Sequence, residues 1–167
     1  MERPRDDFEP TEKSSPPRLD GSRILVVDDT EDIRNLLARV IERAGAKVRT
    51  ASSAEEALAA IGEAPPDLIL TDIGMPGADG FELLDRVRHS PRTEARDIRA
   101  IALTGFTSHG YRERCLAAGF EDHLAKPIDL EHLIASIARA LGRGPGRPKP
   151  SDFPRRVCGF DAQARAI

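Results

Sequence analysis

Cysteine is scarce in this chain: its 167 residues include only two, Cys115 and Cys158. The two lie far apart in the sequence and fit no spacing at which cysteines bind a metal ion. A cysteine metal site is therefore excluded, and we interpret both residues as free thiols of a protein in a reducing compartment.

Long apolar runs are also absent. No stretch approaches the roughly 18 apolar residues that a membrane-spanning helix needs, and the polar start MERPRDDFEP has no signal-peptide core. The net charge of -3 is too small to indicate nucleic acid or a membrane as a partner. We therefore expect a cytoplasmic protein.

The chain is long enough for one domain with tails. Hydrophobic residues make up 40% and charged residues 32% of it, as in ordinary globular proteins. Residues 1–20 carry prolines among charges, with Phe8 and Leu19 as the only large apolar side chains, so we expect a flexible segment there. We place the domain at residues 21–142. Residues 143–167 show no helix or strand period and are mildly basic, which predicts a second flexible tail.

Within that tail, Gly146-Arg147-Pro148 resembles the core of an AT-hook, in which an extended Arg-Pro segment enters the minor groove of DNA. So short a match arises easily by chance in a linker rich in proline, glycine and arginine. We interpret the tail as solvated and do not expect DNA binding.

The domain itself shows a strand followed by a helix five times. Its central strand is the apolar run Leu68–Leu70, bounded by Pro65-Pro66 and by the glycine-rich loop after Asp72, which predicts burial on both faces. The predicted strands span residues 23–27, 47–51, 68–72, 98–103 and 123–125. The predicted helices span roughly residues 30–44, 53–61, 81–87, 111–118 and 130–141. A charged, irregular connection is expected at residues 91–97.

Five such repeats predict an α/β fold. A parallel sheet of five strands would lie between two layers of helices, and the two layers together would contain five helices. The flavodoxin-like doubly wound order 2-1-3-4-5 fits best. Folds of this order bind ligands beyond the carboxyl ends of the strands, between the first and third strands, where the order reverses.

Polar residues follow four of the predicted strands at that edge: Asp28 and Asp29, Asp72, Thr104, and Lys126. Three converging carboxylates repel one another, and a hard divalent cation relieves the repulsion. Mg2+ suits the site because it takes one or two carboxylates, keeps several waters and accepts phosphate oxygens. A carboxylate beside a metal ion, a lysine and a hydroxyl is equipped to receive a phosphoryl group.

Four motifs carry a family resemblance: LVVDD at residues 25–29, DIGMPGADG at 72–80, ALTG at 102–105 and AKP at 125–127. With them, the sequence resembles a receiver domain of the two-component response regulator family. The resemblance covers residues 23–141.

The resemblance implies a role for each residue of the acidic group. Asp72 is the expected phosphoacceptor. Asp28 and Asp29 are expected to bind Mg2+ together with Asp72, and the backbone carbonyl of Gly74 completes the protein ligands. Family members often carry a side chain at the position of Gly74 that tunes hydrolysis, and here there is none.

The resemblance also implies a switch. Thr104 is expected to contact the phosphoryl oxygen after transfer, and Lys126 to pair with it. The peptide bond before Pro127 is expected to be cis, which would direct the lysine into the site. His123 stands where the family usually has Tyr or Phe as a conformational switch; its imidazole is either such a switch or an ordinary strand residue.

We therefore expect a phosphoacceptor rather than an enzyme, with at most self-catalysed phosphorylation and dephosphorylation. The phosphoryl group would come from a histidine kinase or a histidine phosphotransfer protein. No helix-turn-helix pattern follows Leu141, so the expected readout is a downstream partner protein, or a homodimer formed on phosphorylation. The partner protein, or the second copy of the chain, would bind the surface formed by the last two helices and the last strand.

Three alternatives remain open at this stage. The first is a phosphorelay shuttle or the receiver of a hybrid histidine kinase. The second is a Mg2+-dependent hydrolase that forms an aspartyl-phosphate, although Gly74 stands where its general acid would be needed. The third is a flavodoxin-like nucleotide binder, which lacks a phosphate-cradling glycine loop after the first strand.

Overall fold

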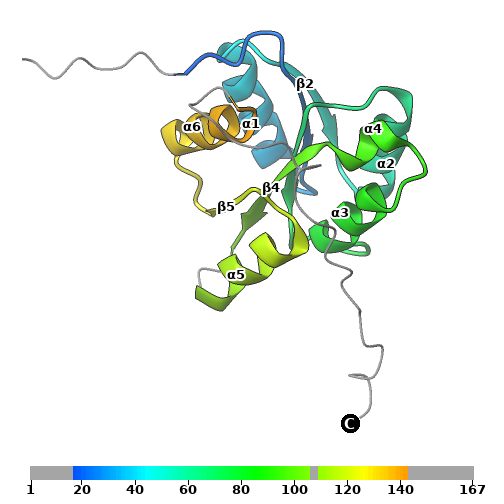
Figure 1. The fold of residues 1–167 in the computed structure, drawn as a ribbon. Coiled ribbons are helices and arrows are strands. Elements are labelled where there is room, and N and C mark those ends of the chain that lie inside the picture. The colour runs from blue at the N-terminus through cyan, green and yellow to red at the C-terminus, as the bar shows by residue number, and fades with distance from the viewer. Residues whose placement is uncertain (1–16, 106–108, 143–167) are drawn as a thin grey trace, which may run out of the picture.

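The computed structural model describes residues 17–105 and 109–142 and shows one sheet with helices on both faces (Figure 1). The strands are β1 (Arg23–Val27), β2 (Lys47–Ala51), β3 (Leu68–Asp72), β4 (Arg99–Thr104) and β5 (Asp122–Ala125). The helices are α1 (Glu31–Arg43), α2 (Ala54–Glu63), α3 (Gly80–Arg88), α4 (Thr93–Arg96), α5 (His109–Ala118) and α6 (Leu130–Ala140). The strands are parallel in the order β2-β1-β3-β4-β5, which confirms the predicted flavodoxin-like topology.

The core follows from the alternation of side chains along the central strands. Leu68 and Leu70 pack on the face covered by α1 and α6, whereas Ile69 packs on the face covered by α2 and α3. Ala100 and Ala102 face α5, where a small cluster fills the space. Every residue of β3 is buried, as the unbroken apolar run predicts.

The described residues contain six helices, one more than predicted. The extra helix, α4, is a single turn in the connection 91–97 that we expected to be irregular. Ala95 is buried there, and the guanidinium of Arg88 donates to the carbonyls of Arg96 and Ile98 at 2.9 and 2.6 Å. A four-residue turn with one apolar side chain has no detectable period, so tertiary contacts rather than sequence pattern reveal it.

The position of Leu19 corrects one expectation. We placed it in the flexible segment 1–20, yet its side chain is fully buried in the same cluster as Ile41. Its backbone N–H donates to the carbonyl of Ala44 at 2.7 Å. The segment cannot bury Leu19 within itself, but the end of α1 and the start of β1 provide a pocket for it.

Other expectations concern residues outside the described part of the chain. These are residues 1–16 of the predicted N-terminal segment and the whole predicted tail 143–167, including Cys158 and the AT-hook-like Gly146-Arg147-Pro148.

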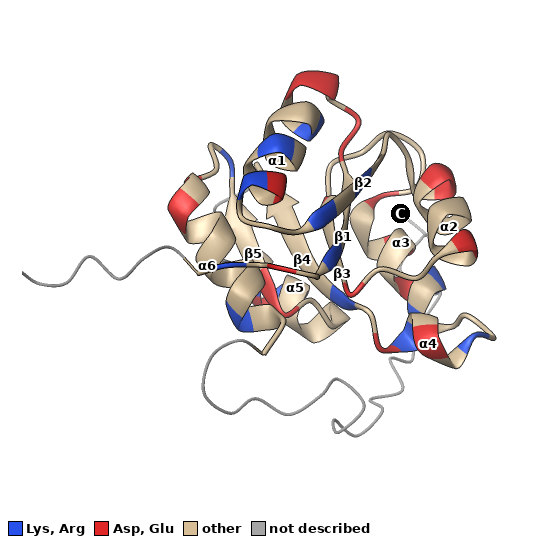
Figure 2. Cartoon of the chain, turned by 90° about the horizontal axis from the view of Figure 1, so that it is seen from above, with Lys and Arg blue, Asp and Glu red and all other residues tan. Residues whose placement is uncertain are grey.

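None of the described helices combines the length and hydropathy that a bilayer span requires. Helices such as α1 and α4 carry both acidic and basic residues (Figure 2).

Candidate functional site

Five polar residues meet at the carboxyl edge of the sheet. Asp28 and Asp29 follow β1, Asp72 ends β3, Thr104 ends β4, and Lys126 follows β5. The parallel pairing brings these strand ends level with one another. The structure thus places all five polar residues predicted for this edge together, and we call them the rim residues.

Asp28, Asp29 and Asp72 form an acidic cluster in which one oxygen of each carboxylate lies within 4.8 Å of the others. Asp28 and Asp72 are buried and Asp29 is exposed, so the cluster opens to solvent on one side. Mg2+ binds oxygen at about 2.0–2.1 Å in an octahedron, so adjacent ligands stand roughly 3 Å apart and opposite ligands roughly 4 Å apart. The spacing of the three carboxylates is close to this range, and their hard oxygen ligands suit a divalent cation of this kind.

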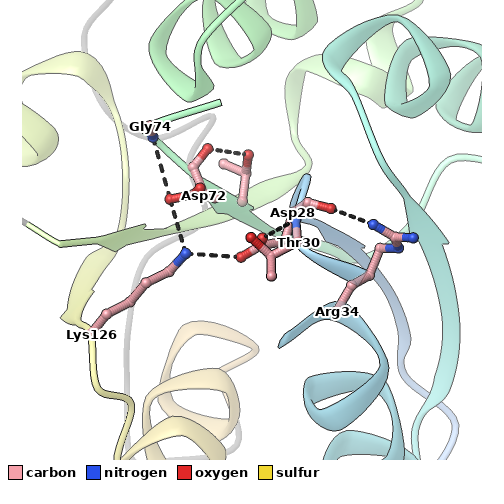
Figure 3. A network of polar contacts seen from close by, with 7 residues as sticks. Asp28, Thr30, Arg34, Asp72, Gly74 and Lys126 are labelled. Atoms are coloured by element: carbon pink, nitrogen blue, oxygen red, sulfur yellow. Dashed lines mark hydrogen bonds and ion pairs between the residues drawn. The ribbon is translucent and has the colours of Figure 1, made fainter. Parts of the chain in front are cut away.

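Three hydrogen bonds hold Asp28 in place (Figure 3). Its Oδ1 accepts the N–H of Thr30 at 2.8 Å, and its Oδ2 accepts Nζ of Lys126 at 3.0 Å. Its backbone carbonyl accepts a hydrogen bond from Nη1 of Arg34 at 2.7 Å. Arg34 was not identified from the sequence, because no local pattern shows that the first turns of α1 reach back over the end of β1.

Asp72 is nearly as buried, with 7% of its surface exposed. Its Oδ1 accepts the N–H of Gly74 at 3.3 Å and lies 3.3 Å from Nζ of Lys126. Thr71 donates to the backbone carbonyl of Asp72 at 3.0 Å. The hydrogen bond and the ion pair of the Asp72 side chain both involve Oδ1, and within the described residues Oδ2 accepts no side-chain or backbone hydrogen bond. The carbonyl of Gly74 as a metal ligand remains a prediction.

Lys126 bridges the two buried carboxylates, with Nζ 3.0 Å from Asp28 and 3.3 Å from Asp72 (Figure 3). Burial alone would lower the pKa of Lys126. The hydrogen bond to Asp28 and the charges of Asp72 and Asp28 outweigh that effect and raise the pKa above its ordinary value. The ammonium is therefore a permanent cation at neutral pH. The peptide bond between Lys126 and Pro127 is cis, as expected.

Thr104 is 99% buried, and its side chain lies within hydrogen-bonding reach of Tyr111 on α5. Burial raises the pKa of Tyr111 above its ordinary value, the neighbouring Cys115 raises it further, and the bond to Thr104 opposes the rise. Tyr111 was also missed from the sequence, where it served only to mark the start of a helix. Its spacing from Thr104 carries no sign that the two hydroxyls meet.

His123 lies on β5 opposite Ala102 of β4. Its Nδ1 is buried and has no hydrogen-bond partner within the described part of the chain. A switch role for His123 therefore stays a prediction.

Comparison with known proteins places these residues in a family context. Residues 24–138 match the family model of the response regulator receiver domain. That range contains all five rim residues and most of the described chain.

Individual proteins and solved structures are also similar to this chain. An uncharacterized 14.6 kDa protein of Leptolyngbya boryana is 45% identical over 114 residues, which cover 68% of this chain and 86% of that protein. The phosphate regulon transcriptional regulatory protein PhoB of Pseudomonas aeruginosa is 36% identical over 141 residues, 84% of this chain, and the chain spans 59% of its length. The solved structure of a putative response regulator from Chloroflexus aurantiacus J-10-fl has a TM-score of 0.68 and 34% identity, and the match covers 73% of this chain and 98% of that one.

Proposed function

The chain belongs to the response regulator receiver domain family, and we propose that it accepts a phosphoryl group on Asp72 from the phosphohistidine of a histidine kinase or phosphotransfer protein. The observation that carries the proposal is the cluster of Asp28, Asp29 and Asp72 beside the ammonium of Lys126. It supplies a nucleophilic oxygen together with charges that compensate the transferring group. We take residues 21–142 as the functional unit, acting in the cytoplasm.

In the proposed step, Oδ2 of Asp72 attacks the phosphorus in line with the donor nitrogen. A P–O bond forms as the P–N bond breaks, and the imidazole nitrogen keeps the electron pair. Oδ1 of Asp72 stays held by the N–H of Gly74. Lys126, released from part of its pairing with Asp72, pairs with an oxygen of the phosphoryl group.

Asp28, Asp29 and Asp72 would hold Mg2+, with the carbonyl of Gly74 as a further ligand. Mg2+, when bound, neutralises charge on the transferring phosphoryl oxygens. The residues around Asp28 prepare this site, because Arg34 and the backbone of the first turn hold the loop that presents the acidic pair.

The proposed output is a change in the surface made by α5, β5 and α6. The hydroxyl of Thr104 donates a hydrogen bond to the phosphoryl group, and the resulting movement changes that surface, with His123 on β5 as a second candidate switch. A downstream protein, or a second copy of the chain, would read the change.

Two related activities are separated from this proposal by kinetics. A phosphorelay shuttle would return the group rapidly to a histidine phosphotransfer protein. A hydrolase would turn over phosphate monoesters steadily, and Gly74 argues against this activity because a glycine offers no general acid.

Labelling by acetyl phosphate tests the proposal directly. We expect the full chain to take up one phosphoryl group in the presence of Mg2+, and Asp72→Asn to take up none. Asp85→Asn is the matched control, because Asp85 is an exposed carboxylate on α3 away from the site. Full labelling of the Asp72 variant would contradict the assignment of the acceptor.

A further inference from the structure

A cavity of about 240 Å³ lies near the amino ends of β1 and β2, away from the candidate site. The two strands form one side of it and the end of α2 forms another, with Leu25, Ala60 and Ala64 among the lining residues. Its walls are almost entirely apolar, and it is partly open to solvent. A cavity of about 150 Å³ accommodates a benzene molecule, so this one is large enough for an aromatic ring.

Three cationic residues, Arg23, Lys47 and Arg49, also line the cavity, and we call them the cationic margin (β1 and β2 in Figure 2). Because the walls are apolar, these residues contribute their methylene stems and keep their charged ends outside. Arg23 pairs with Asp67 at 3.2 Å and Arg49 pairs with Glu63 at 2.7 Å, whereas Lys47 forms no ion pair within residues 17–105 and 109–142. Three cations against two carboxylates leave a net positive charge beside an apolar cavity. The cavity therefore suits an aromatic side chain flanked by carboxylates.

The chain itself contains such a sequence shortly before the first described residue. Residues 6–9 read Asp-Asp-Phe-Glu, so Phe8 has three carboxylates as neighbours and no cation among them. Phe153, on the other side of the domain in the sequence, is closely followed by Arg155 and Arg156, which the cationic margin would repel. Charge complementarity therefore favours Phe8.

The length of the connecting chain allows Phe8 to reach the cavity. Leu19 is fully buried, and four residues further on the chain reaches Arg23, at most about 14 Å away. The 11 residues from Phe8 to Leu19 span up to about 40 Å when extended. A segment tethered so close to its site is present there at an effective concentration in the mM range.

We propose that residues 6–9 bind back onto the domain, with the ring of Phe8 in this cavity and the three carboxylates beside the cationic margin. The segment buries too little apolar surface to order itself. The domain supplies what it lacks, as it already does for Leu19. The cavity lies at the opposite ends of the strands from Asp72, so this binding does not depend on phosphorylation and the inference is independent of the proposed function.

The deciding experiment is NMR spectroscopy of the isotopically labelled full chain. We expect nuclear Overhauser effects between the ring protons of Phe8 and the methyl protons of Leu25 and Ala64. Such effects from Phe153 or Phe160, or from no phenylalanine, would overturn the inference. A mixture of labelled and unlabelled chains identifies a second copy as the occupant; effects seen only between copies would also overturn it.

Competition by a free peptide provides a second test. A synthetic peptide of residues 1–12 is titrated into the full-length wild type and into the Phe8→Ala and Phe153→Ala variants. If the peptide binds the free cavity with a Kd of about 0.1 mM, a tethered segment at about 1 mM weakens its binding about tenfold. The peptide should therefore bind Phe8→Ala about tenfold more tightly than the wild type or Phe153→Ala. Equal affinities for all three chains would overturn the inference.

A pair of variants at Ala64 tests the role of charge. Ala64 is an exposed residue directly after α2 that lines the cavity. Glutamate and lysine are both long side chains there and differ in the sign of their charge. In the Phe8→Ala background, Ala64→Glu should bind the peptide about twofold to fivefold more weakly than Ala64→Lys. Equal affinities would overturn the charge pairing and with it the choice of residues 6–9.

The proposed function is tested separately in the same samples. Beryllofluoride mimics a phosphoryl group on a carboxylate, and with Mg2+ it should form an adduct equally well in the wild type and in Phe8→Ala. Absence of the adduct in both would overturn the proposed function and leave this inference standing. Loss of the adduct in Phe8→Ala alone would overturn the independence of the two sites.

Discussion

Lys126, after β5, pairs with Asp28, after β1, across 98 residues of sequence, with Nζ 3.0 Å from Oδ2. The carboxylate of Asp28 is fully buried, and the lysine side chain is 23% exposed. The pair crosses the ends of the two intervening strands, β3 and β4. It closes the polar edge of the sheet and compensates the charge that the acidic cluster concentrates there.

Removing the lysine should therefore destabilise the fold. Lys126→Met leaves Asp28 buried without its cation, and we expect the free energy of unfolding to fall by about 2–3 kcal/mol in the absence of Mg2+. Mg2+ should restore more stability to this variant than it adds to the wild type, because a cation then compensates the same carboxylates. Urea unfolding with and without Mg2+ measures both effects. Lys47→Met, at an exposed lysine on β2, is the control, and equal stability of the two variants would contradict the argument.

Arg34 should matter for metal binding although it is not a ligand. Its bond to the carbonyl of Asp28 holds the loop that carries the acidic pair. We expect Arg34→Ala to weaken Mg2+ binding about tenfold, as is typical of residues that orient ligands. Arg39→Ala, at an exposed position of the same helix, should bind Mg2+ like the wild type in calorimetric titrations. Identical affinities for the two variants would show that Arg34 does not orient the site.

Asp29 should separate metal binding from stability. Its side chain is exposed, whereas that of Asp28 is fully buried. Asp29→Asn should weaken Mg2+ binding about tenfold or more while leaving urea unfolding of the metal-free protein within about 0.5 kcal/mol of the wild type. Undiminished Mg2+ affinity in this variant would remove Asp29 from the ligand set.

The alkaline titration of Tyr111 has a predicted direction. Burial raises its pKa above the ordinary value of 10.0, so the folded protein should titrate at higher pH than the urea-unfolded chain. A raised folded pKa means that this contribution to stability is present below pH 10.0 and is lost as the pH rises through the folded pKa. Thr104→Val should raise the pKa further, because the bond it removes lowers it. Ultraviolet absorbance of the single phenolate measures the pKa of Tyr111 in the folded wild type, in the urea-unfolded chain and in the folded Thr104→Val variant. A pKa in the folded wild type at or below that of the unfolded chain would contradict the predicted effect of burial.

Much of the fold could be predicted from local sequence. Five repeats of strand and helix specify a parallel sheet, and the unbroken run in β3 identifies the central strand. The burial of Leu19 and the single turn α4 could not be predicted, because both depend on pockets made by distant elements. Pattern reasoning detects repeated apolar positions, and each of these features has only one.

The candidate site divides in the same way. Residues directly after strands could be located, since the ends of parallel strands share one edge, and the rim from Asp28 to Lys126 was found by this reasoning. Arg34 and Tyr111 could not, because each reaches the site from a helix whose angle to the sheet is set by packing. Their partners are a backbone carbonyl and a buried hydroxyl, neither of which leaves a trace in sequence spacing.

The central claim is that Asp72 carries the phosphoryl group, and a crystal structure of the full chain with Mg2+ and beryllofluoride tests it most directly. The account predicts the beryllium on Oδ2 of Asp72, with Mg2+ bound by Asp28, Asp29 and Asp72. It also predicts that the hydroxyl of Thr104 faces the fluorides. An adduct on any other side chain, or a well-ordered Asp72 without one at saturating beryllofluoride, would contradict it.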